Sequence, residues 1–149
     1  MELNILRADP AGNITVFVLD PVEKAQRAAI AEKIMAIPAL KAEQVGYACA
    51  AEDDVDGHME MMGGEFCGNA TRAYGMYIAQ QKGGLSSVRL RVSGCDHAVT
   101  AQVDLKSGTA RAEMPCPRSV KRVTVNGHEG TLVDLTGTVS YTHLTLPTN

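Results

Sequence analysis

Two different spacings of apolar residues divide this chain into strand-forming and helix-forming segments. Ile14–Leu19 is an almost continuous apolar run rich in β-branched residues, which predicts a buried strand. From Val88 onward, apolar and polar residues alternate, which is typical of strands with one buried face. Residues 21–37 and 67–82 instead carry apolar residues at helical spacing. The pattern therefore predicts two helices among eight or nine short strands.

The number of short strands indicates the class of fold. The predicted strands are Leu3–Arg7, Ile14–Leu19, Gln44–Ala50, His58–Met62, Val88–Val92, Ala98–Leu105, Thr109–Met114, Val120–Val125 and Gly130–Leu135. Asn126-Gly127 is a hairpin turn signal between the last two. So many strands do not fit an alternating βαβ fold. We predict an α+β fold in which a mostly antiparallel, curved and barrel-like sheet wraps around the second helix.

The two helices have different patterns. In the first, Asp20 is the predicted N-cap and Pro21 the first helical residue. Its predicted apolar stripe comprises Val22, Ala25, Ala29, Ile30, Ile34 and Ile37. The second is apolar or small on most sides, with Arg72 as the only charge between Cys67 and Ile78. Because a surface helix would show a single stripe, the second helix is predicted to be enclosed.

A cysteine opens the second helix. The unpaired N–H groups and the positive end of the helix dipole favour an anion at such a position, either a thiolate or a ligand carboxylate. Gly68 follows, and the lack of a Cβ lets a ligand approach these amides. Free cysteines are also commonly buried and inert. From the residues alone, a reactive Cys67 and a core helix that happens to begin with cysteine both remain open.

Composition and charge exclude several classes of function. The net charge of −3 over 149 residues gives no reason to expect nucleic acid or an anionic membrane as a partner. The four cysteines have no CxxC spacing, so no metal site is predicted. We expect Cys49 to be a core residue, Cys95 and Cys116 to be incidental, and Arg72 to be structural. The histidines His58, His97 and His128 are expected to be solvated. Without a signal peptide or long apolar stretch, a cytoplasmic protein with reduced thiols is expected.

The segment Gly64–Arg72, with its Cys-Gly-Asn at a helix start, resembles the diaminopimelate epimerase-like superfamily. These are amino-acid racemases and epimerases that use two cysteines and no pyridoxal phosphate. The resemblance implies a sheet curled around the central helix, in one of two domains that face each other across the substrate. It also implies Cys67 as a catalytic base and Asn13, Gln44, Gly68 and Asn69 as substrate-binding residues. No cofactor and no metal are implied.

The chemistry of such enzymes requires two bases on opposite faces of an α-carbon. The second cysteine is expected from a C-terminal domain that is missing here. We expect residues 1–137 to be the N-terminal domain. Residues 139–148, VSYTHLTLPT, match one reading frame of a common transposase-based sequencing adapter, so 138–149 is predicted to be a non-native tail. The fragment alone is expected to be inactive. Its expected partners are a small amino-acid substrate, the missing domain and a possible homodimer copy.

Several functional alternatives stay open at this point. Diaminopimelate epimerase, and with it lysine biosynthesis, is the first expectation. Ala70 and Ala73 depart from that pattern and favour the histidine racemases of metallophore pathways, whereas Asn69 argues against proline racemases. From other classes, a non-catalytic carboxylate-binding module needs only the helix start, and a thiol-redox protein needs a resolving partner for Cys67. The lack of a nearby second cysteine favours the racemase or epimerase.

Overall fold

The computed structural model describes residues 2–52, 54–135 and 138–143. It divides the chain into two compact units, Met1–Met114 and Pro115–Asn149. The first unit holds a seven-stranded sheet and both helices, and the second holds a three-stranded sheet. The candidate site lies in the first unit.

The first unit alternates strands with two helices. Its strands are β1 (Ile5–Ala8), β2 (Thr15–Val18), β3 (Gln44–Cys49), β4 (Gly57–Met61), β5 (Ser87–Val92), β6 (Val99–Asp104) and β7 (Thr109–Ala112). The helices are α1 (Lys24–Met35), between β2 and β3, and α2 (Gly68–Gln81), between β4 and β5. Every strand predicted before residue 115 is present, with boundaries shifted by a few residues.

The sheet is mixed rather than simply antiparallel. Its strands follow sequence order, and four neighbouring pairs are antiparallel. The pairs β2/β3 and β4/β5 are parallel. Each parallel pair flanks a helix, because a helical crossover returns the chain to the same end of the sheet. The predicted α+β class and the strong curl are confirmed, whereas the antiparallel description holds for only part of the sheet, which contains two βαβ units.

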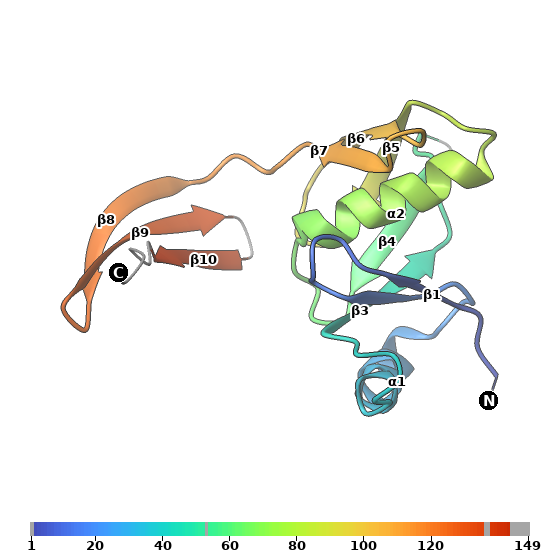
Figure 1. Ribbon diagram of the computed structural model, residues 1–149, viewed down its shortest axis with the longest axis horizontal. Helices are drawn as coiled ribbons and strands as arrows, with labels where there is room; N and C mark the ends of the chain where they lie inside the picture. Colours follow the sequence, from blue (N-terminus) through green and yellow to red (C-terminus); the bar gives the residue numbers. More distant parts are fainter. Residues whose placement is uncertain (1, 53, 136–137, 144–149) are drawn as a thin grey trace. The chain divides into compact units, whose positions relative to one another are not determined.

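Strand alternation gives the sheet two buried faces, each covered by one helix (Figure 1). In β2, Val16 and Val18 pack with α1, while Phe17 between them packs with α2. Val45 and Tyr47 of β3 join the α1 side. β2 is therefore fully buried, as its apolar run predicted.

Close approach of the sheet encloses one side of α2. A Cβ on Gly75 would lie 2.8 Å from the Cβ of Ala101 in β6, so only glycine allows this packing. Six residues of the helix are buried: Ala70, Thr71, Tyr74, Gly75, Ile78 and Ala79. Arg72, Ala73, Met76 and Tyr77 are only half-buried. The enclosure is thus one-sided, and the predicted all-round burial of α2 was too strong.

The start of α1 differs from the prediction. Glu23, not Asp20, is the N-cap, and its side chain makes no capping hydrogen bond. The Asp20 carboxylate instead accepts hydrogen bonds from the side chain and backbone N–H of Asn4, at 2.9 and 2.5 Å, and these bonds lower the pKa of Asp20. Ile30, Ala31 and Ile34 are the buried residues of the helix. Ala25, Ala29 and Ile37 of the predicted stripe are exposed.

The second unit is an antiparallel sheet of β8 (Ser119–Val125), β9 (His128–Leu135) and β10 (Thr138–His143). Asn126 and Gly127 have φ values of 51° and 80°, so they form the predicted hairpin turn. β10 falls in the segment 138–149, whose non-native origin stays a prediction. Residues 136–137 and 144–149 lie outside the described part. In the described residues, neither helix is long and apolar enough to cross a membrane.

Candidate active site

Cys67 is the N-cap of α2, as the sequence predicted. It has extended backbone angles (φ −129°, ψ 108°), and its Sγ accepts a hydrogen bond from the backbone N–H of Ala70 at 3.4 Å. Thr71 Oγ1 donates to the Cys67 carbonyl at 2.8 Å, which fixes the first turn. The first N–H groups of a helix have no acceptors within the helix, so this half-buried sulfur lies where a negative charge is stabilised.

The sheet brings two further predicted site residues to this sulfur. Gln44, the first residue of β3, lies on the α2 side, and its Nε2 donates to Cys67 Sγ at 3.3 Å. The same nitrogen donates to Asn13 Oδ1 at 2.5 Å. Asn13 precedes β2, which pairs with β3 in parallel. Cys67, Gln44 and Asn13 therefore form one hydrogen-bonded group, although their binding roles stay predictions.

The other two predicted site residues lie in the first turn of α2. A Cβ on Gly68 would be 3.1 Å from Met114 Sδ, so the glycine leaves room there for this side chain. The side-chain oxygen of Asn69 accepts a hydrogen bond from Arg72 Nη2. Arg72 thus has the kind of structural contact expected of it. Whether Gly68 and Asn69 hold a substrate stays a prediction.

Sequence reasoning missed two residues of the group. Thr15 is fully buried, and its Oγ1 accepts from Gln44 Nε2 at 2.7 Å. Glu43 is exposed, and its Oε2 accepts from Asn13 Nδ2 at 3.3 Å. A threonine within an apolar strand gives no functional signal in the sequence. Glu43 stands beside Gln44, but only the structure shows that it meets Asn13.

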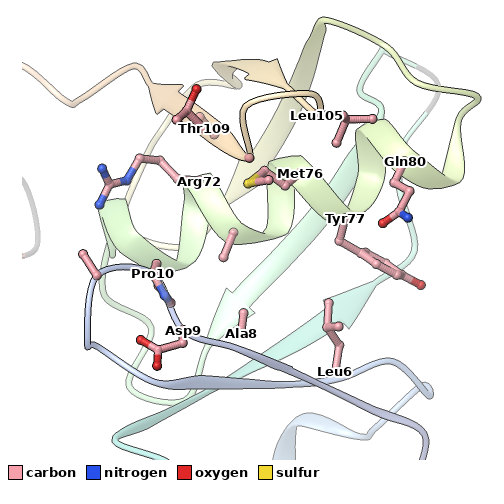
Figure 2. A pocket seen from close by; sticks show the side chains of 14 residues that line it. Leu6, Ala8, Asp9, Pro10, Arg72, Met76, Tyr77, Gln80, Leu105 and Thr109 are labelled. Carbon is pink, nitrogen blue, oxygen red and sulfur yellow. The ribbon is translucent and has the colours of Figure 1, made fainter.

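A cavity of about 550 Å³ lies along the half-buried face of α2 (Figure 2). Its lining comes from the β1 region, the helix and the β6–β7 hairpin: Leu6, Ala8, Asp9, Pro10, Ala11, Arg72, Ala73, Met76, Tyr77, Gln80, Leu105, Gly108, Thr109 and Ala110. Cys67 is not among these residues. β1 and β7 are the first and last strands of the sheet, so the cavity marks where the curl stops short of closing. We therefore place the candidate site at the Cys67 thiol and its hydrogen-bond partners, not in this cavity.

A second polar group surrounds Cys49 on the α1 side of the sheet. Arg27 pairs with Glu60, and its Nη2 donates to Cys49 Sγ at 3.4 Å. Burial raises the pKa of the Cys49 thiol despite this cation. Cys49 is thus half-buried in a polar setting, not a simple core residue. His58, expected to be solvated, is also largely covered and lies 3.9 Å from Glu60.

Within the described residues, no cluster of three or more histidine, cysteine or acidic side chains could hold a metal ion. Two N–H groups donate to Cys67 Sγ, the side-chain amide of Gln44 and the backbone of Ala70, and such donors suit hydrogen bonding to an anion.

The first unit is thus an α+β domain with a cysteine at the start of the helix that its curled sheet partly encloses. The chain belongs to the histidine racemase CntK N-terminal domain family, whose model matches residues 2–146. It is 31% identical over 144 residues to a histidine racemase of Fusobacterium nucleatum subsp. nucleatum, covering 91% of this chain and 52% of the relative. It is 32% identical over 122 residues to a histidine racemase of Staphylococcus aureus strain Mu50, covering 79% and 44%. The chain spans about half the length of these curated relatives.

These comparisons bear on two expectations from the sequence. Both relatives are named histidine racemases, so they favour the histidine alternative over diaminopimelate epimerase. They lend no support to the expectation of lysine biosynthesis. A family named for histidine racemase agrees with the expectation that the enzyme is an isomerase.

Proposed function

We propose that this chain forms the N-terminal half of a cofactor-independent histidine racemase in which Cys67 is one of two bases. The observation that carries the proposal is the position of Cys67 Sγ, which caps α2 and receives hydrogen bonds from Ala70 N and Gln44 Nε2. The names of the relatives support histidine as the substrate. The resemblance of Cys67-Gly68-Asn69 to diaminopimelate epimerase-like enzymes supports the absence of pyridoxal phosphate.

Inversion would proceed by transfer of two protons. The Cys67 thiolate takes the α-proton from one face of histidine and becomes a thiol, leaving an enolate-like carbanion. A second acid, expected to be a cysteine outside this chain, gives a proton to the opposite face and becomes the thiolate. The reverse reaction exchanges the two roles.

The start of α2 would stabilise the intermediate. The substrate carboxylate, bound at the first-turn amides of Gly68 and Asn69, gains negative charge as the α-proton leaves. N–H groups and the positive end of the helix dipole are already oriented toward that charge, so little reorganisation is needed. Asn13 and Gln44 would bind the polar groups of the substrate beside the sulfur.

The test compares this 149-residue chain with the full-length protein that would carry the proposed second domain. Chiral chromatography would follow inversion of L-histidine, and mass spectrometry would follow deuterium uptake at Cα in D₂O. We expect the full-length protein to invert histidine and the 149-residue chain not to. Robust inversion by the chain alone would overturn the assignment of the second acid to another domain. Inversion of diaminopimelate but not histidine would overturn the substrate, and binding without exchange would support the carboxylate-binding module.

A further inference from the structure

The amide of Gln44 can present either a donor or an acceptor to Cys67. Its nitrogen carries two hydrogens but lies within hydrogen-bond distance of three acceptors. These are Asn13 Oδ1 at 2.5 Å, Thr15 Oγ1 at 2.7 Å and Cys67 Sγ at 3.3 Å. Turning the amide over would place its carbonyl oxygen against the sulfur at little steric cost. The orientation of Gln44 therefore decides which group the sulfur meets.

Asn13 fixes that orientation, and Glu43 fixes Asn13. An ionised carboxylate only accepts hydrogen bonds, so the Asn13 side chain must direct its NH₂ group toward Glu43 Oε2, 3.3 Å away. The side-chain oxygen of Asn13 then faces Gln44, so the Gln44 amide must direct its nitrogen toward that oxygen. Thr15 agrees with this arrangement, because its hydroxyl can donate to the backbone carbonyl of Asn13 and accept from Gln44 Nε2. A hydroxyl can rotate, however, whereas the carboxylate cannot become a donor.

We infer that Glu43 is a positioning residue that acts through Asn13 and Gln44 to direct an N–H group at the sulfur of Cys67. A hydrogen bond donated to sulfur favours the thiolate, which is the stronger acceptor. The relevance of this thiolate to catalysis rests on the proposed function. The orientation itself does not, so it is tested on the thiol directly.

Three charged groups lie close to Cys67 in the fold or in the sequence. Glu43 reaches it through the two amides, Arg72 is bound to Asn69 in the first turn, and Glu65 precedes Cys67 by two residues. Simple charge repulsion by Glu43 would disfavour the thiolate, so its removal would raise the reactivity of the sulfur. Orientation of the amides predicts the opposite sign. The two effects can therefore be separated by one substitution.

The experiment measures iodoacetamide alkylation of Cys67 by mass spectrometry across a range of pH, in this chain. Glu43→Met removes the acceptor, and Glu43→Gln allows both orientations of Asn13. We expect Glu43→Met to slow alkylation of Cys67 at neutral pH by about three- to tenfold, with Glu43→Gln intermediate. The pH at which alkylation of Cys67 reaches half its maximal rate should rise from the wild type through Glu43→Gln to Glu43→Met. Because Glu43 is exposed, neither change should unfold the chain.

The control is Glu32→Gln, which makes the same change of charge at an exposed position of α1. It should leave Cys67 unaffected, and alkylation of Cys49 should be unchanged in all three variants. Faster alkylation of Cys67 in the Glu43 variants would show that charge dominates and would overturn the inference. An unchanged profile would overturn it as well. If the full-length protein did not invert histidine, the alkylation rates expected here would not change, so the two proposals are tested separately.

Discussion

On each face of the curled sheet a half-buried thiol accepts a hydrogen bond from a side-chain nitrogen, but the two donors differ in charge. Cys49, on the α1 side, accepts from the guanidinium of Arg27 at 3.4 Å, and Cys67, on the α2 side, accepts from the Gln44 amide at 3.3 Å. Arg27 is already paired with Glu60, and burial raises the pKa of Cys49. A neighbouring cation therefore does not suffice to activate a thiol when burial and a carboxylate oppose it.

Cys67 differs in the source of its hydrogen bonds. Both donors, Ala70 N and Gln44 Nε2, are uncharged groups held by the fold, and neither is committed to an ion pair. They act together with the positive end of α2. Preorganised dipoles can stabilise a charge that forms during a reaction, although Gln44 Nε2 shares its two hydrogens among Asn13 Oδ1, Thr15 Oγ1 and this sulfur.

The largest expected effect separates the two thiols by activity. In the full-length protein, Cys67→Ala should lower histidine inversion by at least about a hundredfold, because the proposed general base is lost. Cys49→Ala should leave inversion close to wild type. Chiral chromatography measures both variants. Equal losses would show that the two thiols act together or that the loss reflects folding, which circular dichroism of each variant would reveal.

The next effect concerns the reactivity of the thiols in this chain. Cys116 is exposed, so it is first replaced by serine to remove its background. At neutral pH, iodoacetamide should then label Cys67 about tenfold or more faster than Cys49 or Cys95. Burial raises the pKa of both slower thiols. Earlier labelling of Cys49 or Cys95 would count heavily against Cys67 as the active thiol.

Local signals in the sequence explain which features could be predicted. The apolar run of β2, the Asn126-Gly127 turn and the helix start at Cys67 each depend on residues close together in the chain, and all three are present. The resemblance to a known family added Gln44, which donates to Cys67 Sγ, and Asn13, which contacts Gln44. Neither residue carries a local signal strong enough to be chosen without it.

Contacts between distant segments explain what could not be predicted. Asp20 has the sequence of an N-cap, but Asn4 binds its carboxylate, so α1 begins later. The parallel pairs follow from where two crossovers return the chain, which periodicity does not encode. Thr15 reads as an ordinary strand residue, because its partner Gln44 comes from another strand.

A smaller effect compares a buried tyrosine on each face. Tyr47 OH donates to the Arg27 carbonyl at 2.5 Å on the α1 side, and Tyr74 OH donates to the His58 carbonyl at 3.1 Å on the α2 side. Replacing either with phenylalanine should lower the free energy of unfolding by about 1 kcal/mol. We expect the larger loss for Tyr47→Phe, whose bond is shorter. Urea denaturation of both variants gives the comparison, and a larger loss for Tyr74→Phe would contradict it.

The smallest expected effect is an increase in the reactivity of the Cys49 thiol toward that of Cys67. Burial is the main cause of its raised pKa, and the negative charge of Glu60 raises it further, while Arg27 lowers it. Glu60→Gln removes the negative charge and keeps the contact of Arg27 Nη2 with the sulfur. The pKa of Cys49 should then fall, so more thiolate is present at a given pH.

Alkylation of Cys49 in Glu60→Gln should therefore be about two- to threefold faster at pH 8, and its pH profile should move to lower pH. Cys67 should be unchanged, as should both thiols in the Glu32→Gln control. Burial still opposes the thiolate, so Cys49 should remain slower than Cys67. A variant in which Cys49 overtakes Cys67 would show that the carboxylate, rather than burial and the helix start, creates the difference between the two faces.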